Sequence, residues 1–130
     1  MATESLGQRR TPQRQAIQRV IERSSGPLTV GEIQLRAQQR VARLGIATVY
    51  RTVGLLRDAG WLREVVLPSG ETRYEQSGLG HHHHFQCRIC DQVTDLDECP
   101  VSIPDRDDFS GGFVVESHEV TLYGVCPECG

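Results

Sequence analysis

The sequence predicts an α+β chain with an N-terminal winged helix and a small, metal-held second domain that is α/β or mostly β. Three observations predict it: three segments with helical spacing of apolar residues, two extended runs around a turn at 61–75, and two Cys-x-x-Cys pairs in residues 81–130. A chain of 130 residues divided in this way gives each domain little core, so we expect a metal to stabilise the second one.

The first two helices are predicted from their starts. Thr11 offers an N-cap hydroxyl and Pro12 fits the first helical position, and apolar spacing then runs up to the break at 24–27. Thr29 and Glu32 predict a capping box that opens the second helix. The residues expected in or near the buried faces of these two helices are Ile17, Val20, Ile21, Ile33, Leu35, Ala37 and Val41.

The third helix is predicted from 48 to 58, with Val49, Val53 and Leu56 on its buried face. Extended runs at 61–67 and 71–75 flank a Pro-Ser-Gly turn, which is typical of a β-hairpin, the wing. Strands are then expected at 85–88, 92–96 and 113–125. The predicted division is a winged-helix DNA-binding domain at 1–76, a glycine-containing hinge at 77–80 and a metal-binding domain at 81–130.

Charge is divided unevenly between these parts. Residues 1–80 hold twelve arginines and seven acidic residues, a formal +5, whereas residues 81–130 hold two arginines and ten acidic residues, a formal −8. A basic half suits a phosphate backbone, and an acidic half with His and Cys suits cations. Residues 1–10 are polar and predict no signal peptide, and no run has the length of a membrane span. Five cysteines in this spacing favour thiolate–metal chemistry in a reducing cytoplasm.

The metal ligands form two sets in the sequence. Paired Cys-x-x-Cys spacing lets four sulfurs surround one structural zinc, here Cys87, Cys90, Cys126 and Cys129. The histidine tetrad just before them alternates along an expected strand, so His82 and His84 share one face while His81 and His83 share the other. Two further sites on two faces are therefore expected.

Four motifs occur in one order along the chain. They are Arg10-Thr11-Pro12-Gln13-Arg14, the segment Gly45-Ile46-Ala47-Thr48-Val49-Tyr50-Arg51-Thr52, the tetrad His81–His84 with Cys87-x-x-Cys90, and Cys126-x-x-Cys129. This pattern resembles the ferric uptake regulator (Fur) family of bacterial metal-sensing repressors. The resemblance implies a cytoplasmic homodimer, with residues 81–130 as the dimerisation domain. It also implies a repressor, not an enzyme, that binds double-stranded operator DNA when its sensing site is loaded.

The resemblance also implies which residues hold regulatory Fe(2+), Mn(2+) or Zn(2+). The sensing site falls on Glu75, His82, His84 and Asp95, and a second histidine site falls on His81, His83 and His118. The acidic ligand of that second site is open: Ser102 stands about where a glutamate is expected, and Asp97 or Glu98 are substitutes. Cys99 has no assigned role, and a buried free thiol is favoured over an extra ligand.

Two departures from the family pattern bear on the metal. Leu28 stands where many members place a histidine ligand, and Ser77 stands where many zinc sensors place a cysteine. A sensing set of nitrogen and oxygen ligands favours iron, manganese or peroxide sensing over zinc sensing.

The third helix of a winged helix enters the major groove. We therefore expect Ala47, Thr48, Tyr50 and Arg51 near base edges and Arg57 on a phosphate, and the resemblance adds Arg9 and Arg10 in the minor groove. The alternative is that Tyr50 packs in the core and the arginines form a solvated face. Two rival functions are a metal-buffering or zinc-ribbon interaction module without sequence-specific DNA binding, and a catalytic zinc site, which lacks a general-base motif such as H-E-x-x-H.

Overall fold

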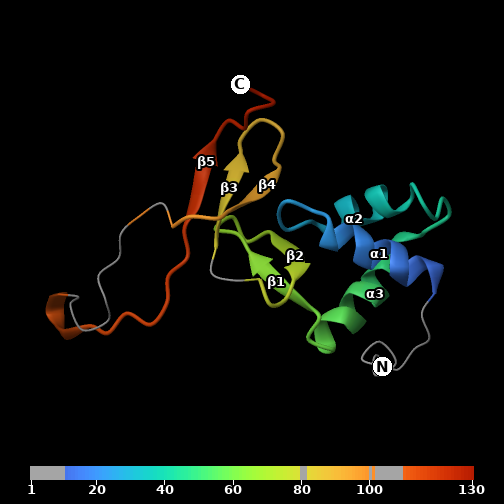
Figure 1. Ribbon diagram of the computed structural model, residues 1–130, viewed down its shortest axis with the longest axis horizontal. Coiled ribbons are helices and arrows are strands. Elements are labelled where there is room, and N and C mark those ends of the chain that lie inside the picture. The colour runs from blue at the N-terminus through green and yellow to red at the C-terminus, as the bar shows by residue number, and fades with distance from the viewer. Residues whose placement is uncertain (1–10, 80–81, 100, 102–109) are drawn as a thin grey trace. The chain divides into compact units, whose positions relative to one another are not determined.

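The computed structural model describes residues 11–79, 82–99, 101 and 110–130. The chain divides into two compact units, residues 1–79 and 80–130, and each is described by itself below (Figure 1). In the part of the chain that is described, no helix is long and apolar enough to cross a membrane.

The first unit opens with three helices, in the predicted order. They are α1 (Pro12–Glu22), α2 (Val30–Ala37) and α3 (Ile46–Asp58). The Thr11 hydroxyl accepts from the Arg14 amide at 3.0 Å, and Thr29 and Glu32 form the predicted capping box. The third helix begins two residues earlier than predicted, because Gly45 in extended conformation serves as its N-cap.

The wing follows directly. Strands β1 (Leu62–Val66) and β2 (Thr72–Gln76) pair antiparallel, with Arg63 opposite Glu75. Gly70 has a φ of +93° in the turn, a conformation that favours glycine. Leu28 exchanges two backbone hydrogen bonds with Tyr74, at 2.9 and 2.8 Å, so the segment before α2 is tied to the edge of the wing. Three helices and this hairpin form the predicted winged helix.

The core of the first unit lies between the helices and the wing. Leu35 does not belong to it: its side chain is 70% exposed, contrary to prediction. The reason is geometric, because Leu35 follows the buried Ile33 by two positions, which is about 200° around a helix. Val41 lies beyond the end of α2 and packs partly against the core. The predicted core residues that are buried include Ile17, Ile21, Ile33, Ala37, Val49, Val53 and Leu56.

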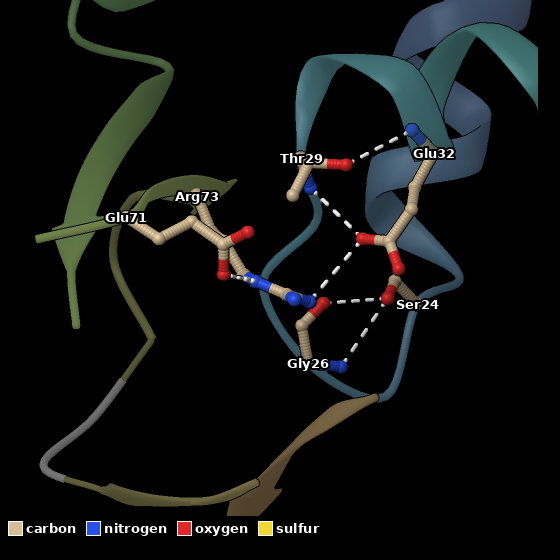
Figure 2. A network of polar contacts seen from close by, with 6 residues as sticks. All are labelled: Ser24, Gly26, Thr29, Glu32, Glu71 and Arg73. Carbon is tan, nitrogen blue, oxygen red and sulfur yellow. Dashed lines mark hydrogen bonds and ion pairs between the residues drawn. The ribbon is translucent and has the colours of Figure 1, made fainter. Parts of the chain in front are cut away.

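A polar network joins the wing to the start of α2 (Figure 2). The Arg73 side chain, only 3% exposed, donates from Nε to Glu71 at 2.9 Å and from Nη1 to Glu32 at 3.2 Å. The same Glu32 oxygen accepts from the Thr29 amide at 2.9 Å. Because the Glu32 carboxylate accepts from both the Thr29 amide and the Arg73 side chain, the network holds β2 against the start of α2.

The second unit is a three-stranded sheet with β3 in the centre (Figure 1). Strand β3 (His83–Cys87) pairs antiparallel with β4 (Val93–Leu96) and parallel with β5 (Thr121–Gly124). Among the described residues between β4 and β5, Ser110–Gly112 form a 3-10 turn, η3. The buried apolar side chains among the described residues of this unit are Cys87 and Val93, so the described part of the unit has a very small apolar core.

The predicted strand at 113–125 is too long, since only residues 121–124 form strand. The register explains the difference. His84 pairs with Thr121 and Cys87 with Gly124, so residues before 121 run past the end of the paired part of β3. A strand needs a neighbour's hydrogen bonds over its length, and β3 offers only five residues.

Candidate metal centres and DNA-reading helix

Four thiols converge at one end of the second unit. The sulfurs of Cys87, Cys90, Cys126 and Cys129 all lie within 4.8 Å of one another. The Cys90 and Cys126 sulfurs are 3.9 Å apart, while zinc–sulfur bonds of about 2.3 Å in a tetrahedron place sulfurs about 3.8 Å apart. The Cys90 and Cys126 sulfurs therefore already have the spacing of a closed zinc site, and all four sulfurs lie close enough to surround one ion.

The electrostatics of this cluster favour a dication. Backbone hydrogen bonds lower the pKa of Cys87 to about 6, and the bond from Cys90 has a larger effect than the bond from Cys126. Its neighbour Cys129 shows the opposite: its hydrogen bond with the Cys126 side chain raises the pKa of Cys129 to about 12. Four thiolates this close together repel one another unless a cation neutralises them, and Zn(2+) supplies that charge.

A nitrogen–oxygen cluster lies on one face of the same sheet. The Nε2 atoms of His82 and His84 lie 3.5 and 3.4 Å from the same Asp95 oxygen. The two imidazole rings meet edge to face, with centroids 5.1 Å apart. Strand pairing positions these groups, because His84 stands opposite Asp95 in the β3–β4 register and His82 precedes β3. Two imidazoles and a carboxylate suit Fe(2+), Mn(2+) or Zn(2+).

Glu75, predicted as the fourth sensing ligand, lies in β2 of the first unit. Its carboxylate accepts from the Arg63 Nε at 2.7 Å, and the Arg63 Nη2 lies 2.5 Å from the same oxygen. The opposite positions of Arg63 and Glu75 in the hairpin place the two side chains together. Any cation that binds this carboxylate therefore competes with a guanidinium.

The opposite face of β3 holds a cluster that the sequence only half predicted. His83, Cys99 and His118 offer ligand atoms within 4.8 Å of one another. The prediction of a buried Cys99 is wrong, because its side chain is exposed and its sulfur lies 3.4 Å from the His118 Nε2. The missed signal is that Cys99 lies three residues after the end of β4, next to Glu98, one of the two acidic candidates for this site.

The third helix exposes the side chains expected to read DNA. Tyr50 is 61% exposed, which excludes the alternative that it packs in the core. Arg51 donates to the Thr48 hydroxyl at 3.1 Å, so the two side chains support each other on the helix surface. Arg57 lies farther along and is paired with Asp58 at 3.3 Å and Glu64 at 3.0 Å. Ala47 is exposed near the start of the helix.

Three predicted site residues, Arg9, Arg10 and His81, lie outside the described residues. The described part of the first unit adds a basic groove that sequence reasoning missed. It has a volume of about 660 Å³ and is lined by Arg19, Val20, Arg23, Arg36, Gln39 and Arg40. The sequence held the signal: Arg19 and Arg23 are four residues apart across the end of α1, and Arg36 and Arg40 are four residues apart across the end of α2.

A winged helix with an exposed third helix, together with a sheet carrying a thiolate cluster and histidine clusters, defines the class of metal-responsive transcription regulators. Residues 5–123 match the ferric uptake regulator family. The chain belongs to this family and is a metal-responsive transcriptional repressor.

Two relatives and one solved structure illustrate the likeness. The ferric uptake regulation protein of Bacillus subtilis is 32% identical over 127 residues, covering 92% of this chain and 83% of the relative. The peroxide-responsive repressor PerR of Staphylococcus epidermidis is 30% identical over 128 residues, covering 95% and 82%. A zinc-bound manganese uptake regulator superposes with a TM-score of 0.79 at 31% identity, covering 96% of each chain.

Proposed function

We propose that this chain acts in the cytoplasm as a homodimer that binds operator DNA when a divalent metal occupies the His82, His84 and Asp95 cluster. The observation that carries the proposal is the convergence of both imidazoles on one Asp95 oxygen, at 3.5 and 3.4 Å. The ligands of this cluster are imidazole nitrogens and a carboxylate oxygen, with no sulfur, and this set favours Fe(2+) or Mn(2+). The four cysteines would bind Zn(2+) instead. The names of its relatives, which include iron, manganese and peroxide regulators, support the same range.

Glu75 is proposed as a further ligand, on its position in the family pattern. Glu75 belongs to the winged-helix unit. Metal binding through Glu75 would therefore restrict the movement of the winged helix about the predicted hinge at 77–80. Metal would then bind better to the arrangement that fits DNA, and by linkage DNA would raise metal affinity by the same factor.

The proposed DNA contacts are made by α3 and by arginines. The exposed Tyr50 and the paired Thr48 and Arg51 support base contacts by the start of this helix. Arg57, Arg9 and Arg10 are proposed as backbone or minor-groove contacts. Arg57 would exchange its carboxylate partners for a phosphate, which weakens its net contribution.

DNA binding by purified protein, with structural zinc retained and the sensing site stripped by a chelator, tests this function. Mn(2+), Fe(2+) under anaerobic conditions, or Zn(2+) is titrated against genomic fragments that include the chain's own promoter. We expect one metal to produce tight, selective binding, and His84→Ala to abolish the metal dependence. Gln86→Ala, on the same strand, is the matched control and should bind as the native chain does.

Equal, weak binding with every metal and with none would contradict the proposal and favour the metal-buffering module. The salt dependence separates the two further, because a regulator that contacts many phosphates loses affinity steeply as salt rises.

A further inference from the structure

The basic groove between α1 and the end of α2 has no part in the contacts proposed so far. It has a volume of about 660 Å³, and its arginines come from two segments that are separate in the sequence. All four of these side chains are exposed. They are Arg19 and Arg23 from the end of α1, and Arg36 and Arg40 from the end of α2 and the turn after it.

These four arginines have no carboxylate partner among the described residues. Ion pairs in this unit use Arg57, Arg63 and Arg73 instead. The sequence from the start of α1 to the turn after α2 holds two acidic residues, Glu22 and Glu32. Glu32 already accepts from Arg73, and Glu22 does not line the groove. Four like charges on one groove repel one another, so the groove favours an anion.

Interaction with the helix ends accounts for only part of this charge. A cation near a helix C-terminus is stabilised by the last carbonyl groups, and Arg19 and Arg36 occupy the last turns of α1 and α2. The effect falls off within about one turn. Arg40 lies three residues beyond the end of α2, so the helix end does not explain why Arg40 joins the groove.

The basic groove continues toward the start of α1. A second hollow of about 190 Å³ shares Arg19 and Arg40 with it and reaches Pro12. From Pro12 to Arg23 a helix rises about 16 Å, so the two hollows together form an elongated track that is longer than one small anion. Pro12 follows Arg10, one of the proposed DNA contacts, by two residues.

The chemistry of the lining favours phosphate groups without recognition of a base. A guanidinium can pair with two phosphate oxygens at once. Among the other described lining residues none is aromatic, so a nucleobase has no ring on which to stack, and none is acidic. These residues are Val20 and Gln39 in the groove and Pro12, Gln15, Ala16 and Val41 in the second hollow.

The end of α2 is tied to the start of α3. The side-chain amides of Gln34 and Gln38 donate to the Leu44 carbonyl at 3.2 and 3.0 Å. Helix α3 begins two residues after Leu44, and Thr48 in its first turn is a proposed base contact. The basic groove is therefore held at a fixed place relative to the helix that is proposed to read bases.

We propose that the basic groove binds backbone phosphates of the DNA duplex, beside the bases that α3 contacts. This inference rests on the proposed function, since it needs the winged helix to bind DNA. Phosphate contacts carry no base information, so the groove contributes equally to binding of the operator and of unrelated duplex. None of its arginines is a candidate metal ligand, so the contribution is the same with and without the sensing metal. The metal-free chain is thereby held weakly on any DNA.

Salt dependence tests the groove directly, because each phosphate that is neutralised adds about 0.9 to the steepness of log K against log salt. Arg19→Gln/Arg40→Gln removes the two arginines that both hollows share. We expect the steepness to fall by about two, and the affinities for the chain's own promoter and for a scrambled duplex to fall by the same factor, about tenfold or more. Fluorescence anisotropy measures both, with Mn(2+) and after chelation, with the structural zinc retained.

Arg43→Gln is the matched control. Arg43 is also exposed and lies in the turn after α2, but it does not line the groove, so its variant should keep the native steepness. Arg19→Lys/Arg40→Lys retains both charges and should restore the steepness. Urea unfolding followed through Trp61 fluorescence checks that each variant is folded, and these exposed positions should leave the free energy of unfolding unchanged.

An unchanged steepness in Arg19→Gln/Arg40→Gln would overturn the proposal. An equal fall in Arg43→Gln would also overturn it, because the effect would then come from net charge. So would a loss confined to the promoter fragment, which indicates base contacts. A glutamate-rich peptide that binds the native chain but not the double variant, with DNA binding unchanged, would assign the groove to an acidic protein segment instead. A native chain that binds DNA with full salt dependence but no metal dependence would contradict the proposed function alone.

Discussion

Loss of zinc from the four-cysteine centre is expected to unfold the described part of the second unit while the winged helix stays folded. The change is Cys126→Ser, which removes one of the four sulfurs that lie within 4.8 Å of one another. Cys99→Ser is the matched control, because it also replaces an exposed or partly exposed cysteine with serine but leaves the four-cysteine centre intact.

The magnitude follows from how little apolar surface the described part of this unit buries. Apart from Cys87, the buried apolar side chain among its described residues is Val93, and burying one valine contributes about 1.5–3 kcal/mol. A structural zinc contributes about 10–16 kcal/mol near neutral pH. The metal therefore outweighs the apolar core several-fold, and without it the sheet cannot offset the entropy of ordering its strands.

Hydrogen exchange followed by mass spectrometry measures the two units separately. Peptides that contain β3 should exchange rapidly in Cys126→Ser and in chelated native protein, while peptides from α1 should keep their protection. Trp61, in the first unit, should keep its folded fluorescence. The reasoning would be refuted by zinc-free protein in which β3 peptides remain protected.

Proton release offers a second measurement on the same centre. If the sheet stayed folded without zinc, Cys87, with a pKa of about 6, would already be ionised at pH 7.5 and would give up few protons, whereas Cys129, with a pKa of about 12, would give up one. An unfolded zinc-free sheet instead has four thiols near the ordinary cysteine pKa of about 8.5, so zinc binding should release close to four protons at pH 7.5. Calorimetry in buffers of different ionisation enthalpy counts these protons; a count lower by one that rises as the pH falls through 6 would contradict the expected unfolding.

Three further predictions concern the first unit. Arg73→Met removes a buried guanidinium from two partly exposed carboxylates. It should lower the free energy of unfolding of this unit by about 1–3 kcal/mol, measured by urea unfolding followed through Trp61 fluorescence. A change below about 0.5 kcal/mol would contradict the network. Arg63→Met removes the guanidinium that competes with a metal for the Glu75 carboxylate. It should tighten sensing-metal binding about two- to fivefold, since a pair with one exposed partner contributes up to about 1 kcal/mol. Unchanged or weaker binding by calorimetry would argue against Glu75 as a ligand. Tyr50→Ala should weaken operator binding by about 1–3 kcal/mol in fluorescence anisotropy without lowering stability, because the side chain is 61% exposed; a large loss of stability would show that Tyr50 packs in the fold.

Local signals in the sequence predicted the helices well because their causes are local. The Thr11 cap and the Thr29–Glu32 capping box involve residues three apart, so their geometry is nearly independent of the rest of the chain. The wing was predicted for the same reason, since its strands flank a short turn. Leu35 was misplaced although the buried Val30, Ile33 and Ala37 define one face of α2, because two positions after Ile33 is about 200° around the helix and therefore on the opposite face.

The sequence by itself determined the winged helix, the grouping of the four cysteines and the alternation of the histidines, because each follows from spacing within a helix, a strand or a Cys-x-x-Cys pair. Only the tertiary structure decided that Cys99 joins His83 and His118, that Arg73 links the wing to α2, and that β5 is four residues long. These features depend on contacts such as the one from Val120 to His83, 37 residues apart. Strand register sets such contacts, and register is fixed by the whole sheet and not by any one segment.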